Sequence, residues 1–193
     1  QNIKEKYKID GDYLLYIGTL QPNKNIEGLI KAFSYLVCSS TTYHLSPITL
    51  VIAGKKGWHY ERIFSLVKEL KLEEKVVFTG FVEEEEKPYL IAGAKAFVFP
   101  SFYEGFGIPV LEAMSLGVPV ITSSAGSLPE VGGAAAIYCN PSEIESIAQA
   151  MKDVLNLNDK RRNEIIKSGR EQCKKFSWEK CAEVILETIC KIQ

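Results

Sequence analysis

The sequence contains little of what several common kinds of site require. Of its 193 residues only two are histidines, His44 and His59, and neither has a Cys, His or acidic partner at metal-ligand spacing. We interpret both as surface residues. The five cysteines are odd in number and form no C-x-x-C pair, so we interpret them as reduced packing residues of a cytoplasmic protein. The absence of a G-x-S-x-G motif argues against a Ser-His-Asp hydrolase.

Neither an excess of charge nor a long apolar run is present. The 23 Lys and Arg residues balance 24 Asp and Glu residues, which argues against nucleic acid as a partner. No apolar run reaches the roughly 20 residues that span a bilayer. A hydrophobic content of 46% is that of a globular domain with one substantial core. The start, QNIKEKYKID, lacks both an initiator Met and a signal-peptide pattern, so we expect a segment of a longer chain.

Short apolar runs alternate with amphipathic segments along the chain. The runs predict buried strands at 13–17, 48–53, 76–79, 97–99, 118–122 and 135–138. This alternation predicts an α/β fold, a Rossmann-like doubly wound parallel sheet of about six strands. Ligands of such sheets bind beyond the carboxyl ends of the strands, here near the switch point between the first and fourth. A polar segment, 39–46, is expected to be a surface loop.

The segment Phe97–Thr122, FVFPSFYEGFGIPVLEAMSLGVPVIT, is the most informative. An apolar strand leads into a glycine-rich loop, then into a helix with Pro109 in its first turn and Gly117 at its end. Amide groups at such a helix start favour an anion such as phosphate. Glu104 and Glu112 flank the helix start, and a carboxylate suits the vicinal diol of a ribose or hexose. The alternative is that Glu112 complements the helix dipole and Glu104 is solvated.

Lysines follow the first two predicted strands at the same edge of the sheet. Lys24 could stabilise the negative charge of a departing diphosphate where no metal is bound, or it is an exposed loop lysine. Lys55 or Lys56 could add a second cation. Trp58 either covers a ligand or caps the core, and we favour core packing.

At Glu104-x7-Glu112, within PSFYEGFGIPVLEAMSLGVPVI, the chain resembles the signature of retaining glycosyltransferases of family four, which have the two-domain GT-B fold. The resemblance runs from Tyr13 to about Trp178 and corresponds to the C-terminal, donor-binding half. It implies transfer of a sugar from a nucleotide-sugar donor to a hydroxyl of a glycan or lipid-linked acceptor, without a metal or another cofactor. It also implies a missing N-terminal acceptor-binding domain, and a cytoplasmic protein of polysaccharide biosynthesis. Peripheral attachment at the inner membrane face would come through the missing domain.

The resemblance carries roles onto individual residues. Lys24 would neutralise the leaving diphosphate, Glu104 would bind sugar hydroxyls, and Glu112 would bind the ribose. The segment around Val82, with Glu84 as a side-chain contact, would meet the nucleobase. The other donor-binding positions that the resemblance implies are Gly18, Thr19, Gly54, Lys55, Gly105, Phe106, Gly107 and Ile108.

The loop GTLQPNKN resembles that of mannosyltransferase-like members, G-T-x-x-P-R-K-N, which favours GDP-mannose over the alternative, a UDP-sugar. It departs from the family at Thr19, where many members have Arg, and at Asn23, where the subgroup has Arg. A non-catalytic nucleotide- or glycan-binding module of the same fold is therefore the alternative function. A nicotinamide dehydrogenase domain is excluded, because the loop is not G-x-G-x-x-G and no acid closes the second strand.

We divide the chain into a linker remnant (1–12), a donor-binding domain (13–176) and a C-terminal helix (177–193). The last helix carries an apolar stripe. It either crosses toward the missing domain or packs on the sheet of this domain. In the isolated chain we expect no sugar transfer.

Overall fold

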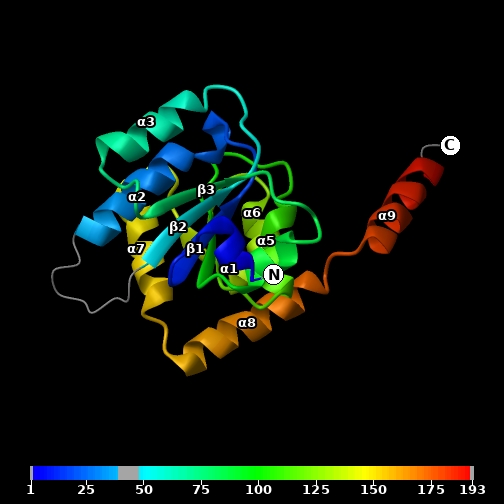
Figure 1. The fold of residues 1–193 in the computed structure, drawn as a ribbon. Helices are drawn as coiled ribbons and strands as arrows, with labels where there is room; N and C mark the ends of the chain where they lie inside the picture. Colours follow the sequence, from blue (N-terminus) through cyan, green and yellow to red (C-terminus); the bar gives the residue numbers. More distant parts are fainter. Residues whose placement is uncertain (1, 39–47, 192–193) are drawn as a thin grey trace.

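A six-stranded, all-parallel sheet forms the centre of the molecule (Figure 1). The computed structural model describes residues 2–38 and 48–191, so the expected surface loop at 39–46, with His44, lies outside the described residues. The strand order is β3-β2-β1-β4-β5-β6, which confirms the predicted doubly wound sheet and its switch point between the first and fourth strands. The strands are β1 (Asp12–Ile17), β2 (Ile48–Ala53), β3 (Val76–Gly80), β4 (Ala96–Phe99), β5 (Val120–Ser123) and β6 (Ile137–Cys139).

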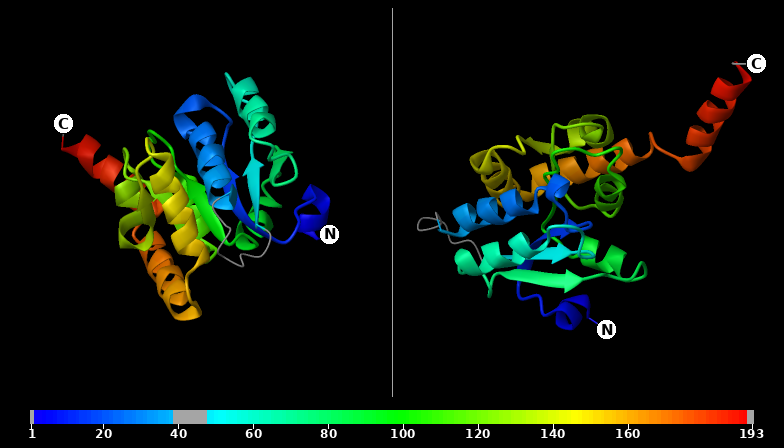
Figure 2. Two further views of the ribbon diagram at one scale, coloured as in Figure 1. Left: turned by 90° about the vertical axis from the view of Figure 1, so that its left-hand side faces the viewer. Right: turned by 90° about the horizontal axis from the view of Figure 1, so that it is seen from above.

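Helices cover both faces of the sheet. On one face α2 packs between α3 and α7, and on the other α5 packs against α4, α6 and α8 (Figure 2). The helices are α1 (Ile3–Tyr7), α2 (Ile26–Cys38), α3 (Glu61–Glu69), α4 (Lys87–Ala92), α5 (Ile108–Ser115), α6 (Leu128–Gly132), α7 (Ile144–Leu155), α8 (Asp159–Cys173) and α9 (Trp178–Cys190), with 3-10 turns η1 (Pro22–Lys24) and η2 (Gly133–Ala135).

The core follows from the continuous apolar runs of the central strands. Tyr13, Leu14 and Leu15 of β1 have no exposed surface, as expected of a parallel strand covered on both faces. The Tyr13 hydroxyl donates to the Leu90 carbonyl at 2.6 Å, so its polar end is satisfied inside the core. Burial raises the pKa of Tyr13 to about 12, and the phenol therefore stays neutral.

Several local predictions need correction. β5 begins at Val120, two residues later than the apolar run, because Val118 and Pro119 form the connection after α5. Ala135 belongs to η2, so β6 is shorter than predicted. Trp58 is 59% exposed, so core packing was wrong for this side chain; it contacts the ring of His59, which is exposed as predicted.

The segment before β1 contacts the four glutamates that precede α4, residues 83–86. Segment 1–12 contains α1, whose Tyr7 hydroxyl donates to Glu86 at 2.7 Å, while Lys6 forms an ion pair with the same carboxylate. Glu83, Glu84 and Glu85, which come shortly before α4, are exposed, which is typical of a solvated helix start. This contact fixes α1 beside α4.

The C-terminal helix lies apart from the rest of the fold (Figure 1). Ser177 caps it by accepting from the Lys180 amide, but α9 has no buried residue. Trp178 is 78% exposed and Leu186 62%. The alternative in which the apolar stripe packs on the sheet of this domain is therefore wrong; the crossing toward a further domain stays a prediction. No helix among residues 2–38 and 48–191 is long and apolar enough to cross a membrane.

The cysteines differ in environment, which corrects their interpretation as packing residues. All five are free; only Cys139 is buried and Cys173 is half-buried. Cys38, Cys181 and Cys190 are exposed.

We predict that Cys139 stays unmodified in the folded protein. Burial raises its pKa to about 12, so almost no thiolate forms near pH 8, whereas unfolding restores an ordinary pKa and reactivity. Pulse labelling with a thiol reagent at pH 8, read by peptide mass spectrometry, should label Cys38, Cys181 and Cys190 first and Cys139 only after denaturant is added. Equal labelling rates for Cys139 and Cys181 in the folded state would contradict the prediction.

Candidate functional site

Two loops meet where the strand order reverses. The first loop (18–25) follows β1, and the fourth loop (100–107) follows the neighbouring strand β4. The Phe102 amide donates to the Asn23 carbonyl at 2.9 Å, which ties the loops together. Because carboxyl ends of parallel strands meet at one edge, this arrangement brings the sequence-predicted residues of both loops together.

An ion pair between Lys24 and Glu104 lies at the centre of this meeting point. The Lys24 Nζ atom lies 2.7 Å from both carboxylate oxygens of Glu104. The side chains are 16% and 10% exposed, respectively. Neither is the solvated loop residue of the alternative interpretation, since each is largely buried against the other. Sequence reasoning singled out both residues but not their direct contact.

Aromatic rings form the floor beneath the ion pair. The Tyr16 ring stacks on Phe99 with centroids 5.9 Å apart, and Lys24 Nζ lies 5.6 Å from the Phe99 centroid. Burial, and then the nearby charge of Glu104, raise the pKa of Tyr16. The phenol is therefore neutral at every physiological pH.

Close packing explains two of the glycines predicted to bind the donor. A Cβ atom on Gly18 would lie 2.6 Å from the Tyr16 hydroxyl oxygen. A Cβ atom on Gly54 would lie only 1.9 Å from the Gly18 carbonyl oxygen, and its φ of +145° also requires glycine. These two positions bring the ends of β1 and β2 into contact and leave no room for side chains.

The start of α5 presents unused amide groups. Gly107 caps the helix with a φ of +100° and no side-chain hydrogen bond. In the part of the chain that the structure describes, the amides of Phe106, Gly107 and Ile108 donate to no protein acceptor. Free amides at a helix N-terminus attract anions. The predicted anion site therefore has its donors in place.

The loop after β5 packs against the backbone of the fourth loop. The Ser127 hydroxyl lies 2.8 Å from the Phe106 carbonyl and 3.1 Å from that of Glu104, and donates to one of them at a time. A Cβ atom on Gly126 would lie 2.7 Å from the Glu104 carbonyl oxygen. The backbone around Glu104 is thus fixed before any ligand binds.

Glu112 occupies a second cluster, with a lysine that sequence reasoning missed. Lys87 Nζ lies 2.9 Å from Glu112 and 3.0 Å from Glu84. Although burial alone lowers the pKa of Lys87, the hydrogen bonds and charges of both carboxylates raise it, so the ammonium stays charged. The signal was the single lysine after four glutamates, three residues beyond Glu84. Glu112, by contrast, lies far along the chain, so no local pattern reveals this pair.

The other residues predicted to contact the donor follow β1, β2 and β3 and take no part in the two ion-pair clusters. Lys55 Nζ lies 4.4 Å from the ring centroid of Phe81, next to the buried Val82, and Thr19 is exposed. Lys56 lies instead over Tyr60 on the α3 side. Of the two compensating lysines considered, Lys55 is the one that reaches the segment around Val82.

Two buried polar atoms without partners mark the loops. Among residues 2–38 and 48–191, only Asn23 Oδ1 and Ser101 Oγ are buried side-chain oxygen or nitrogen atoms that lack a hydrogen bond. They belong to the first and fourth loops, respectively. Unsatisfied buried groups are rare and tend to occur at functional sites. In the same described ranges, no group of three His, Cys, Asp or Glu residues could hold a metal ion.

Comparison with known proteins places the chain in a family. Residues 1–172 match the family described as Glycosyl transferases group 1, and the chain belongs to this family. It is 40% identical over 180 residues to O-antigen chain mannosyltransferase B of Escherichia coli, covering 93% of this chain and 46% of that protein. It is 33% identical over 194 residues to the serotype-specific mannosyltransferase WbdA of Escherichia coli, covering all of this chain and 23% of that protein. The chain thus spans less than half the length of these relatives.

Solved structures agree with the fold. Sucrose-phosphate synthase from Thermosynechococcus elongatus superposes with a TM-score of 0.81 at 27% identity, over 99% of this chain and 48% of that one. The match supports the resemblance to GT-B glycosyltransferases that the Glu104-x7-Glu112 motif indicated.

We predict that two glycines of the fourth loop respond differently to a methyl group. Gly107→Ala should lower the free energy of unfolding by about 1–3 kcal/mol, because φ is +100° and the Cβ atom would lie 2.7 Å from Leu128. Gly105→Ala is the matched control, with nothing within 4 Å of its Cβ position, and should change stability by less than about 1 kcal/mol. Urea denaturation of both variants checks this, and equal losses would contradict it.

Proposed function

We propose that this chain is the donor-binding half of a retaining mannosyltransferase. The full enzyme would transfer mannose from GDP-mannose to a hydroxyl of a glycan acceptor and keep the anomeric configuration. The observation that carries the proposal is the Lys24–Glu104 pair beside three free amides at the start of α5. The mannosyltransferase relatives support mannose as the transferred sugar. The sequence of the first loop, GTLQPNKN, supports GDP rather than UDP as the nucleotide.

The charges of the site determine how a nucleotide sugar would lie. Glu104 repels phosphate, whereas Lys24 and the amides of Phe106, Gly107 and Ile108 attract it. The diphosphate would therefore lie against Lys24 and the helix start. The hydroxyls of the mannose would face the Glu104 carboxylate, which can accept two hydrogen bonds.

Catalysis in this proposal depends on one cation. As the sugar–phosphate bond breaks, negative charge grows on the departing diphosphate, and the Lys24 ammonium stabilises that charge more than it stabilises the bound donor. We propose that this replaces a metal ion and that no further cofactor takes part. Lys55, over the Phe81 ring, would partly compensate for the arginine that the first loop lacks.

The second cluster would bind the nucleoside. The ion pair with Lys87 orients Glu112, so its carboxylate could accept hydrogen bonds from both ribose hydroxyls. The segment around Val82 would contact the base through its backbone. Glu104 precedes the start of α5 and Glu112 lies one turn into the helix, which fits the order sugar, diphosphate, ribose.

We predict that Lys24→Ala, made in the full-length enzyme, lowers kcat about 100-fold and changes donor affinity much less. Lys56→Ala is the matched control, because its ammonium lies over Tyr60, on the α3 side of the sheet. Steady-state kinetics with radiolabelled donor measures both, and proton NMR of the product reads its anomeric configuration. A raised KM with unchanged kcat would refute the role of Lys24. A wild-type enzyme that binds the donor without turnover would favour the non-catalytic module.

We also predict a separation between ribose and sugar contacts. Glu112→Gln and Lys87→Met should both weaken binding of bare GDP about ten-fold, which corresponds to about 1.4 kcal/mol. Glu104→Gln should weaken binding of GDP-mannose and should not weaken binding of bare GDP, because the carboxylate that it removes contacts the sugar and repels phosphate. Isothermal titration of each variant with both ligands tests the assignment; a loss of GDP binding in Glu104→Gln equal to that in Glu112→Gln would show it to be wrong.

A further inference from the structure

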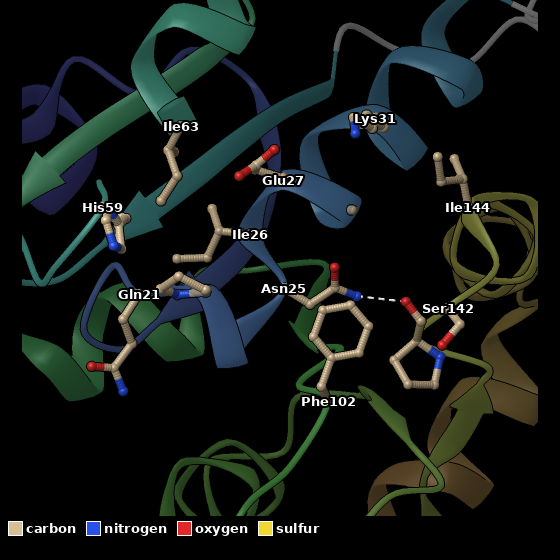
Figure 3. Close-up of a pocket in the computed structure, with 13 residues that line it drawn as sticks. Gln21, Asn25, Ile26, Glu27, Lys31, His59, Ile63, Phe102, Ser142 and Ile144 are labelled. Atoms are coloured by element: carbon tan, nitrogen blue, oxygen red, sulfur yellow. Dashed lines mark hydrogen bonds between the residues drawn. The ribbon is translucent and has the colours of Figure 1, made fainter. Parts of the chain in front are cut away.

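A pocket of about 360 Å³ lies against the first two turns of α2 (Figure 3). Its other walls come from the first and fourth loops and from the starts of α3 and α7. Lys24, Glu104 and Glu112 are not among its lining residues. We call it the α2 pocket. It shares two loops with the candidate donor site, but the proposed chemistry makes no use of it.

The walls of the α2 pocket are fixed by one buried side chain. The Asn25 Nδ2 atom donates to the Pro100 carbonyl at 3.1 Å and to the Pro141 carbonyl at 2.7 Å. Asn25 is 6% exposed, so these bonds are shielded from water. They join the first loop, the fourth loop and the connection from β6 to α7. The pocket is therefore preformed, as small-molecule sites usually are.

The polar groups of the pocket include both donors and acceptors, and its two charges are opposite. The Glu27 carboxylate forms an ion pair with Arg62, with 3.8 Å between Oε2 and Nε. This distance is too long for a hydrogen bond, so the carboxylate oxygens remain acceptors. Within residues 2–38 and 48–191, the Lys31 ammonium pairs with no acid. An anion drawn to Lys31 would be repelled by Glu27, and a cation drawn to Glu27 would be repelled by Lys31. This balance favours a neutral ligand.

Apolar side chains lie on two sides of the pocket, next to these polar groups. Phe102 is 46% exposed and lies in Figure 3 beside Asn25 and the start of α7, while Ile63 lies on the opposite side. Gln21 and Ser142 add an amide and a hydroxyl. A purely apolar ligand would leave these polar groups without water or partners. A ring with hydroxyls at its edge and C–H groups on its face satisfies both kinds of wall.

We propose that the α2 pocket binds a neutral oligosaccharide, a segment of glycan held outside the donor site. Phe102 lies two residues before Glu104, and Gln21 three residues before Lys24, so such a glycan would reach the sheet edge where the donor binds. The choice of a mannose-containing glycan rests on the proposed function. The preference for a neutral saccharide rests on the pocket itself.

The test is titration of the 193-residue chain with α-linked mannotriose, and separately with trigalacturonic acid, an anionic trisaccharide of the same size. Amide shifts in ¹H–¹⁵N spectra should show mannotriose binding with a Kd of about 1 mM or lower, with shifts at the start of α2 and at residues 141–144. The acidic trisaccharide should bind at least about ten-fold more weakly. Bare GDP, titrated alone, should shift amides at the start of α5 instead.

Two variants locate the binding. Phe102→Ala should raise the Kd for mannotriose about ten-fold, and Gln21→Ala should raise it as well. Tyr89→Ala is the matched control, since Tyr89 is 70% exposed on α4 and should leave the Kd within about two-fold. An unchanged melting temperature shows that each variant folds.

Three results would overturn the inference: no shift with mannotriose at about 20 mM, twenty times the expected Kd; equal or tighter binding of the acidic trisaccharide; or no effect of Phe102→Ala. GDP binding without mannotriose binding would refute glycan binding at the α2 pocket and leave the proposed function standing. Mannotriose binding without GDP binding would support the α2 pocket as a glycan site and count against the proposed donor site.

Discussion

The contact between Lys24 and Glu104 joins residues eighty positions apart in the chain. Two largely buried charges lose most of their hydration, and only good geometry and close partners offset this cost. The sheet provides both, because β1 and β4 are neighbours and their loops are tied by a backbone hydrogen bond. In the proposed function a nucleotide sugar would add a third charged group to this pair. The helix start next to the pair supplies amides that donate to no acceptor within residues 2–38 and 48–191.

Much of the fold could be predicted because a parallel sheet covered on both faces needs continuous apolar runs. Such runs are visible in sequence, as in β1, and the loops between them carry their own turn residues. The fourth loop was equally readable, since Gly107 and Pro109 are local signals of a helix start. What was not readable were contacts made only in three dimensions. Lys87 of α4 pairs with Glu112 of α5, and nothing in the local sequence indicates this contact.

The errors have the same origin. A tryptophan suggests burial by composition alone, but Trp58 lies in the loop between β2 and α3 and is 59% exposed. Among the aromatic rings of the described residues, its ring meets only that of His59. An apolar stripe on a helix indicates that another surface covers it but does not identify that surface. The apolar stripe of α9 is not covered by the sheet of this domain. Three of the cysteines are exposed for a related reason, because Cys181 and Cys190 lie on this helix and Cys38 ends α2.

The base of the terminal helix contacts the fourth loop through one aromatic pair. Phe176, just before the capping serine of α9, meets the Phe106 ring edge-on with centroids 5.7 Å apart. Phe106 also carries one of the unused amides at the start of α5. The Ser127 hydroxyl lies 2.8 Å from the Phe106 carbonyl, so the loop that meets the base of the helix is itself held by the loop after β5. The aromatic pair therefore anchors the base of the terminal helix next to the start of α5, although the helix itself buries no residue on this domain.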